Sequence, residues 1–470
     1  MRRIVLCLVL LCGLVLTSAP AFAYVPKEGG TFNVPPPWGD TEQTYRIIRH
    51  VEEAIRQVRP TADDPTPIIL ISAYLMDRKP SSDALIGACR RGVSVRVILD
   101  SGIGTKSAQN LIEVLNGDNP RDTDGDGVLE PPRRGPCNTP LPPPVEEPPP
   151  ASPRLMPDRV ETDALGRELE SSTGDWSQKR IVNSLAIPTD SQATWGSDGS
   201  YVTQCVGSCR GNANGAGNMH SKFYAMSNSG DARWVSMISS SNLNLGGGEY
   251  GWNDLYTTSN RQKTFEGYRQ IHREMTEDKP GGGELREVVD GPFTTRFFPM
   301  AKATMANDPV LDDLNKIRCR GSSLGRTQVH VSMFGWRGTR GTYLADKVFS
   351  LKGQGCAVSV IFGAPSKQMA IYLRQKARAT GVPLYNSRWD LTGDDRKELR
   401  AHTKYVLVKG AYGDNNTAYE VMTGSANWVD GGLDKGDENT LNISLRSAWT
   451  EYKRNWEQIR KHSVRVAGGR

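Results

Sequence analysis

Two histidines of this chain are each followed, two residues later, by a lysine. The first pair is His220 and Lys222, and the second is His402 and Lys404. Both surroundings are typical of β-strands, on which residues two apart face the same side. Each pattern therefore places an imidazole beside an ammonium group.

A Ser-x-Asn pattern follows each pair, and its asparagine lies 22 and 25 residues after the respective histidine. It consists of Ser240 and Asn242 in the first case and of Ser425 and Asn427 in the second. A single His-x-Lys is best explained as a solvated strand face. Histidine, however, occurs only 6 times in 470 residues, so the use of two in a repeated pattern indicates a shared site.

Two histidines, two lysines and two Ser/Asn pairs suit displacement at a phosphodiester. Lysines can neutralise the non-bridging oxygens of the phosphate, and serine and asparagine can donate directional hydrogen bonds to it. One neutral imidazole can attack phosphorus while a second, protonated imidazole donates to the departing oxygen. This chemistry requires no metal ion, and we expect neither a metal nor a cofactor.

At these residues the sequence resembles the phospholipase D superfamily, whose signature is His-x-Lys-x4-Asp with a downstream Gly-Ser-x-Asn, usually present twice. The resemblance covers the chain from about residue 44 onward. It implies two similar α/β halves that share one active site, and a covalent phosphohistidine that water or an alcohol resolves. By position it implies that His220 is the nucleophile and His402 the acid, although the residues alone do not fix this order.

The chain departs from the family signature in both copies. Ser227 and Lys409 occupy the two aspartate positions, and Ser239 stands where the first glycine is expected. One interpretation is an extended hairpin that carries the replaced positions away from the site. The other is an inactive module that binds phosphate without turnover.

Each catalytic histidine needs a partner that fixes its tautomer. In the family, an acidic residue soon after Gly-Ser-x-Asn resembles such a partner. Glu438 follows the second pattern by 11 residues and is our candidate for orienting His402. The same offset in the first copy gives Asn253, so we assign its neighbour Asp254 to His220. The alternative is that Glu438 belongs to an exposed loop.

The remaining histidines and three tryptophans receive less specific interpretations. Trp252, Trp336 and Trp428 follow expected strands and could line an acyl or base pocket, but packing in the core or a loop explains them equally well. The other histidines are assigned to structure: His50, His272, His330 and His462.

The elements that must position these residues occur in one order, twice. Helices and strands are expected over residues 45–58, 68–75, 82–91 and 93–99, and again over 310–317, 329–334, 344–351 and 357–362. This order predicts an α/β fold of two similar halves, each a mostly parallel sheet flanked by helices, packed as a pseudo-dimer. Any two parallel-sheet segments would align about as well, so this alignment alone does not prove a repeat.

The chain divides into segments of different composition. A basic start, an apolar run and Ala21-Phe22-Ala23 predict a secretory signal cleaved after Ala23, since the run is too short for a membrane span. We expect a signal peptide over 1–23, a leader over 24–43, a first half over 44–262 with a proline-rich insertion over 120–155, a connecting segment over 263–308 and a second half over 309–470.

The insertion shows two further patterns. Residues 131–153 hold 11 of the 29 prolines, which favours extended chain. The run from Asp122 to Glu130 has the oxygen spacing of a calcium loop, but Arg133 replaces the final bidentate glutamate. A solvated acidic turn is the better interpretation.

Cysteine usage predicts disulfide bonds. Removal of the signal leaves an even set: Cys89, Cys137, Cys205, Cys209, Cys319 and Cys356. Cys205 with Cys209 could close a local loop, and Cys319 with Cys356 flank one predicted unit, although six cysteines allow 15 pairings. A metal site at Cys205 and Cys209 would need more ligands than His220 offers.

Composition limits the function class but does not choose a substrate. The chain is 37% hydrophobic and 23% charged, which excludes a collagen, a coiled coil and a fully disordered chain. Removing Arg2 and Arg3 leaves 56 basic and 52 acidic residues, a net charge of +4, which is a weak bias. The resemblance to the phospholipase D superfamily, together with the signal segment, implies a secreted monomeric phosphodiesterase that acts on phospholipids, by hydrolysis or transfer, during transient contact with a membrane surface. The alternatives are a secreted nuclease, with nucleic acid as substrate, and an inactive phosphate-binding module.

Overall fold

The computed structural model describes residues 24–100, 105–115, 161–162, 168–169, 199–205, 207–211, 217–277, 283–391, 393 and 397–468. The expected signal peptide and the whole insertion over 120–155, with the run from Asp122 to Glu130, lie outside the described residues.

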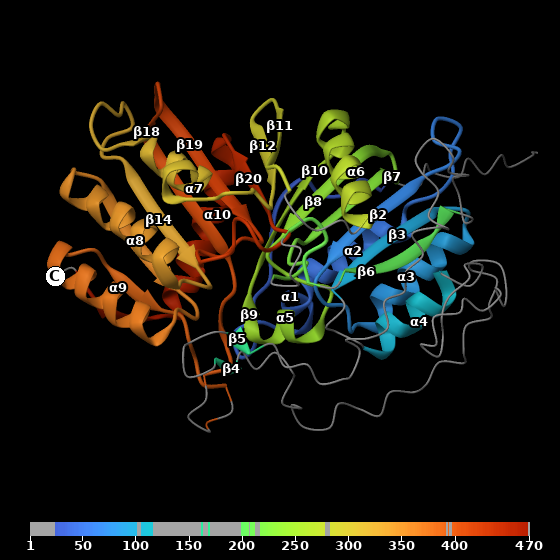
Figure 1. Cartoon of the computed structure of the whole chain (residues 1–470), viewed down its shortest axis with the longest axis horizontal. Helices are drawn as coiled ribbons and strands as arrows, with labels where there is room; N and C mark the ends of the chain where they lie inside the picture. The colour runs from blue at the N-terminus through green and yellow to red at the C-terminus, as the bar shows by residue number, and fades with distance from the viewer. Residues whose placement is uncertain are drawn as a thin grey trace, which may run out of the picture.

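Two mixed β-sheets, each covered by helices, lie side by side (Figure 1). The first has the order β1 (Gly29–Phe32), β10 (Asp254–Thr258), β8 (Ala232–Ser239), β7 (Phe223–Ser229), β2 (Ile68–Ala73), β3 (Ser94–Asp100) and β6 (Tyr201–Cys205). The second has the order β11 (Arg286–Asp290), β12 (Phe293–Phe297), β20 (Asn439–Ile443), β19 (Asn415–Gly424), β18 (Lys404–Tyr412), β14 (Gln328–Met333), β15 (Ala357–Phe362), β16 (Leu384–Asn386) and β21 (Val464–Ala467).

The two sheets repeat one topology. The order β10-β8-β7-β2-β3-β6 in the first corresponds strand for strand to β20-β19-β18-β14-β15-β16 in the second, which confirms two similar α/β halves. The expectation of mostly parallel sheets is wrong in detail. Parallel pairing joins β2 to β3 to β6 and β14 to β15 to β16, whereas the hairpins β7–β8 and β18–β19 return the chain directly and are antiparallel.

Helices cover both faces of each sheet. One face of the first sheet is covered by α2 (Arg46–Arg56), α3 (Lys79–Arg90) and α4 (Lys106–Leu115), and the other face by α6 (Gln262–Thr276). One face of the second sheet is covered by α7 (Pro309–Asn315), α8 (Gly338–Gly353) and α9 (Lys367–Thr380), and the other face by α10 (Arg446–Lys461). Short elements complete the described chain: α1 (Thr41–Thr44), α5 (Leu245–Tyr250), a 3₁₀ turn (Met305–Asn307), β4 (Glu161–Thr162), β5 (Glu168–Leu169), β9 (Gly251–Trp252), β13 (Ile317–Arg318) and β17 (Arg400–Ala401).

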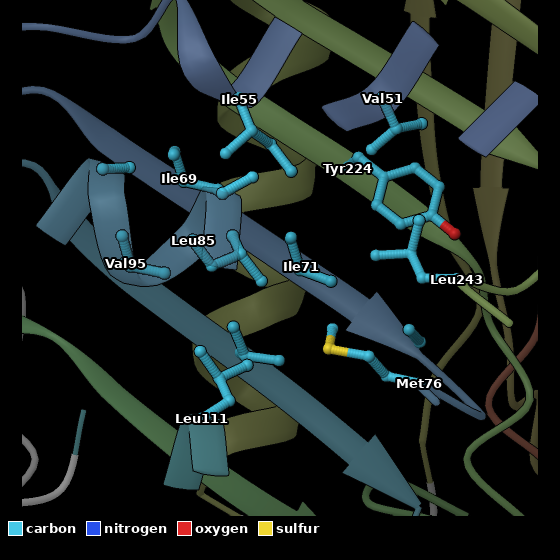
Figure 2. Close-up of a cluster of buried hydrophobic side chains, with 14 of the residues drawn as sticks. Val51, Ile55, Ile69, Ile71, Met76, Leu85, Val95, Leu111, Tyr224 and Leu243 are labelled. Atoms are coloured by element: carbon cyan, nitrogen blue, oxygen red, sulfur yellow. The ribbon is translucent and has the colours of Figure 1, made fainter. Parts of the chain in front are cut away.

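Alternation along the strands explains why each sheet holds helices on both faces. On β2, Ile69 and Ile71 face α2 and α3, where they pack against Val51, Ile55 and Leu85 (Figure 2). The intervening residues of β2 face α6. A third cluster joins α10 to the second sheet and also includes Ile238, Trp252 and Tyr256 of the first half. This cluster packs the halves against each other.

Two expected boundaries fall inside folded units. Gly29–Phe32, which we assigned to a leader, form β1 and pair with β10. The segment 263–308 is divided between the halves, because α6 packs on the first sheet whereas β12 pairs with β20 of the second.

Two of the expected cysteine pairs are formed. Disulfides join Cys205 to Cys209 and Cys319 to Cys356. Within the described parts of the chain, no helix has the length and apolar character that crossing a membrane requires.

Candidate active site

Each histidine of the repeated pattern lies where its half of the chain is bonded to the other half. His402 N donates to the carbonyl of Trp252 (2.9 Å), directly after β17 pairs with β9. His220 N donates to the carbonyl of Asp437 (3.0 Å), directly after Met219 pairs with Asp437. The two connections are equivalent under the repeat, so backbone pairing carries both motifs to the junction between the halves.

Glu438 orients His220, not His402 as we expected from the sequence. His220 Nδ1 lies 2.8 Å from Glu438 Oε1. Because an ionised carboxylate only accepts, the ring carries its hydrogen on Nδ1 and leaves Nε2 for chemistry. Burial would raise the pKa of Glu438, but the charges of His220 and Lys222 hold it below its usual value. The assignment of Glu438 to His402 was wrong because each half supplies its orienting residue to the histidine of the other half.

The corresponding position of the first half, Asn253, orients His402. His402 Nδ1 lies 2.8 Å from Asn253 Oδ1. The Asn253 amide nitrogen donates to the carbonyls of Gly247 (2.6 Å) and Gly251 (3.2 Å), which fixes its oxygen toward the ring. His402 therefore also carries hydrogen on Nδ1, but its partner is neutral.

The surroundings of His402 disfavour its charged form. Burial and the nearby charges of Lys404, Arg400, Lys222 and His220 hold the pKa of His402 well below its usual value. Lys222 and His220 belong to the first half, so the structure brings both motifs into one electrostatic environment.

Asp254 lies beneath the site and does not contact His220, contrary to our assignment. Its carboxylate accepts from Ser240 Oγ (2.7 Å), Tyr452 Oη (3.0 Å) and the hydroxyl of Thr423. Burial raises the pKa of Asp254. The amide and the acid are in opposite order in the two copies, because the first half reads Asn253-Asp254 where the second reads Glu438-Asn439.

Both serines of the Ser-x-Asn patterns are buried and bonded within the protein. Ser240 Oγ contacts Asp254, while Ser425 Oγ contacts Asn439 Oδ1 (2.9 Å) and Glu438 Oε2. Asn439 Oδ1 also accepts from Lys222 N (3.2 Å). The serines thus support the segments that carry the histidine partners.

The two asparagines of these patterns have different surroundings. Asn427 Oδ1 accepts from Gly335 N (3.0 Å), and a Cβ at Gly335 would lie 2.8 Å from Asn427 Cγ, so this approach requires glycine. Asn242 is partly exposed, and its buried Oδ1 accepts no hydrogen bond from the described residues.

Each lysine is held between a backbone carbonyl and an aromatic ring. Lys222 Nζ donates to His220 O (2.6 Å) and lies 5.4 Å from the ring centroid of Tyr74. Lys404 Nζ donates to His402 O (2.6 Å), lies 3.2 Å from His402 Nε2 and lies 4.9 Å from the ring centroid of Phe334.

Tyr74 and Phe334 are site residues that sequence reasoning missed. Their rings contact His220 and His402, with centroids 5.5 and 4.5 Å apart. Both follow a serine by two residues at the end of corresponding strands, β2 and β14. The matching sequences Ser72-Ala73-Tyr74 and Ser332-Met333-Phe334 were a signal that could have identified them.

The replaced aspartate positions lie along the hairpins, away from the histidines. Ser227 Oγ lies 2.6 Å from Asp64 Oδ2. Lys409 is five residues beyond Lys404 on β18, roughly 16 Å at strand spacing, and its Nζ lies 5.7 Å from the ring centroid of Trp449. The structure therefore agrees with the extended-hairpin interpretation.

The three tryptophans belong to the core. Trp252, Trp336 and Trp428 are 1%, 0% and 3% exposed, and the last two pack edge to face at 4.7 Å. The four other histidines likewise make structural contacts: His50 with Thr257, His272 with Ile71 O, His330 with Ser359, and His462 with Trp38. Among the residues that the structure describes, no group of three or more His, Cys, Asp or Glu could hold a metal ion.

Residues 323–460 match the family model described as cardiolipin synthase, PLD-like domain. A comparison with the curated proteins finds no match. Phosphatidylserine synthase from Haemophilus influenzae Rd KW20 is 12% identical, with 95% of this chain and 89% of that chain covered and a TM-score of 0.50.

Two further solved structures match with TM-scores below 0.5. Polyphosphate kinase from Porphyromonas gingivalis is 10% identical (TM-score 0.47), with 91% of this chain covered; this chain spans only 46% of the kinase. The phospholipase D family member Nuc from Salmonella typhimurium is 13% identical over 37% of this chain and 98% of its own, with a TM-score of 0.28.

Proposed function

We propose that the chain is a phosphodiesterase of the phospholipase D superfamily that releases or exchanges the head groups of phospholipids. His220 Nε2 attacks phosphorus, the P–O bond to the head group breaks, and a phosphatidyl-histidine forms. Water or an alcohol then attacks the same phosphorus and releases His220.

The observation that carries this proposal is the hydrogen bond between His220 and Glu438. A histidine phosphorylated on Nε2 and hydrogenated on Nδ1 bears positive charge. The Glu438 carboxylate, 2.8 Å from Nδ1, stabilises that charge as it develops. This favours His220 as the nucleophile.

His402 is suited to the proton-transfer role. Asn253 fixes its ring without adding negative charge, so a protonated His402 is a strong acid. An anionic phosphate in the site offsets the surrounding cations and promotes protonation of Nε2. His402 then donates that proton to the departing head-group oxygen, and in the second step it takes a proton from the incoming water or alcohol.

The two lysines are suited to hold the phosphate. Each ammonium is fixed by the carbonyl of its own histidine, and Lys404 Nζ lies within 3.2 Å of His402 Nε2. Preorganised cations of this kind stabilise charge on the non-bridging oxygens during displacement. Asn242 and Asn427 would add directional donors.

The family match supports a lipid substrate, because residues 323–460 match a model named for cardiolipin synthase. A nuclease would use the same chemistry on nucleic acid. The start of the sequence supports an exported protein, and recovery of secreted chain beginning at Tyr24 would test that part of the proposal.

The decisive experiment is trapping of the intermediate. Purified protein is mixed with phosphatidylcholine, phosphatidylglycerol or DNA for milliseconds to seconds and is quenched in alkali, in which phosphohistidine survives. Intact-protein and peptide mass spectrometry then give the mass and position of the adduct. We expect a phosphatidyl adduct on His220 with phospholipids and no adduct with DNA.

Matched variants control this experiment. His220→Ala should abolish adduct and turnover, while His50→Gln, on the outer helix α2, should change neither. An adduct on His402 would reverse the proposed roles. A nucleotide adduct would favour the nuclease, and no adduct or turnover with any diester would favour the binding module.

A further inference from the structure

Asp437, the residue before Glu438 in the second half, is bound by the disulfide-closed loop of the first half. Asp437 precedes Glu438, and its carboxylate accepts from Cys209 N (2.5 Å), Ser208 Oγ (2.9 Å) and Arg210 N (3.1 Å). Successive backbone donors of this kind form a fixed anion cradle. The Cys205–Cys209 disulfide closes the loop that presents them.

Asp437 is directly connected to the proposed nucleophile. Its carbonyl accepts from His220 N (3.0 Å), and its own N donates to Asn218 O (3.0 Å). Asp437 therefore fixes the backbone on which His220 sits and the backbone from which the Glu438 side chain reaches His220. A shift of Asp437 would move both members of that hydrogen bond.

A second connection reaches Glu438 from the same loop. Arg210 donates to Phe298 O (3.2 Å), and Phe298 N donates to Glu438 O (2.8 Å). Glu274 holds the Arg210 guanidinium in an ion pair (3.1 Å). The loop thus fixes the Glu438 peptide from two directions.

The repeat of the two halves does not by itself require a buried aspartate at position 437. The residue equivalent to Asp437 in the first half is Trp252, which packs against Trp38 and His462. Asp437 is 1% exposed, and burial of a carboxylate is costly unless it is well bonded. Burial raises the pKa of Asp437 to about 6 despite its three donors. The chain thus keeps a buried carboxylate, which reduces stability, at position 437 and not at the equivalent position 252.

We propose that Asp437 is a positioning residue which, bound by residues 208–210 beside the Cys205–Cys209 disulfide, holds Glu438 in register with His220. The inference rests on the proposed function, since it concerns how the nucleophile is held. It assigns to the Cys205–Cys209 disulfide a role in the catalytic step, which the Cys319–Cys356 disulfide does not share.

The test combines kinetics with a direct view of the hydrogen bond. Pre-steady-state release of p-nitrophenol from phosphatidyl-p-nitrophenol reports the attack on phosphorus. In ¹H NMR, the Nδ1 proton of His220, assigned by its loss in His220→Gln, reports the bond to Glu438. We expect Asp437→Ala to slow the burst about a hundredfold, as displacement of a reacting group does, to leave unchanged the substrate concentration that gives a half-maximal burst rate, and to shift the Nδ1 proton upfield. Cys205→Ser/Cys209→Ser should do the same to a smaller degree.

Two control variants test for a general loss of stability. Cys319→Ser/Cys356→Ser removes the other described disulfide, and Asp313→Asn alters a buried carboxylate bonded to Arg296, Lys316 and Asn442. Both should preserve the burst and the proton signal. If Asp437 and the loop act together, adding the cysteine changes to Asp437→Ala should cause little further loss.

Each result distinguishes the inference from the proposed function. Wild-type protein that turns over no phosphodiester would refute the proposed function, while the NMR signal and its response to Asp437→Ala would still test the positioning role. Retention of the burst and the proton signal in Asp437→Ala would overturn the inference. So would an equal loss of both in Asp313→Asn.

Discussion

His220 and Glu438 lie 218 positions apart in different halves of the chain, and their side chains are joined at 2.8 Å. The equivalent bond in the other direction joins His402 to Asn253. The halves thus share a topology but give their histidines different partners, one anionic and one neutral. This difference provides a physical basis for two distinct roles.

The charge of Glu438 should matter more than its hydrogen bond. Glu438→Gln can still accept from His220 Nδ1 but cannot stabilise a cationic phosphohistidine. We expect the burst rate constant to fall by up to about 10⁴-fold, the loss seen when an orienting carboxylate is replaced by its amide. Stopped-flow measurement with phosphatidyl-p-nitrophenol would test this.

A second buried glutamate is the control for this prediction. Glu420 on β19 is bonded to Ser444, and burial raises its pKa to about 7, but it contacts no site residue. Glu420→Gln should leave the burst unchanged. An unaltered burst in Glu438→Gln would contradict the role given to its charge.

Asn253→Asp should shift the pH dependence of kcat/KM. The acid role needs protonated His402, so kcat/KM falls as pH rises above the pKa of His402, which burial and four nearby cationic groups hold low. An aspartate at 253 would stabilise the imidazolium and raise this pKa. The decline should then begin about 1 to 2 pH units higher, as measured by full pH–rate profiles.

Asn253→Ala separates this electrostatic effect from loss of orientation. It removes the acceptor without adding charge, so we expect lower kcat/KM at every pH and no upward shift of the decline. A profile that Asn253→Asp leaves in place would argue against His402 as the acid.

The loss of unfolding free energy caused by Asp254→Asn should become smaller as pH rises. Burial raises the native pKa of Asp254 above its unfolded value, so the native state binds the proton more tightly. The wild-type free energy of unfolding therefore decreases, relative to the variant, as pH rises through the interval between the two pKa values. Urea unfolding of both proteins between pH 4 and 8 measures this. A constant difference would contradict the prediction.

Restoring the family aspartates should not increase activity. Ser227→Asp would place a second carboxylate against Asp64, and we expect a loss of about 1 to 3 kcal/mol in the free energy of unfolding. Lys409→Asp removes the contact with Trp449 and should cost about 0.5 to 1 kcal/mol. Turnover should stay at the wild-type level in both. A gain in turnover would show that these positions take part in chemistry.

The fold and the site histidines could be predicted from the sequence, because both depend on local patterns that occur twice. Strand β15 coincides with its expected range of 357–362, since a β-branched run flanked by helices is a strong signal. The sheets proved mixed because strand direction depends on which strands become neighbours, and this is not visible in local periodicity.

The histidine partners could be found by spacing but not assigned. The spacing predicts that Glu438 orients His402 of its own half, whereas its carboxylate is hydrogen-bonded to His220 of the other half. Only the pairing of Met219 with Asp437 and of Ala401 with Trp252 shows that each partner is delivered across the junction. Asp437 was missed because its importance comes from loop 205–211, more than 200 positions away.

The backbone bonds from His220 to Asp437 and from His402 to Trp252 also limit how substrates can enter and leave. If the two halves moved apart, these backbone hydrogen bonds would break first and the site would lose its geometry. We therefore expect substrate and product to exchange by movement of surrounding side chains and surface loops, with both halves fixed. Product release should then be insensitive to a covalent cross-link that joins the two halves away from the site.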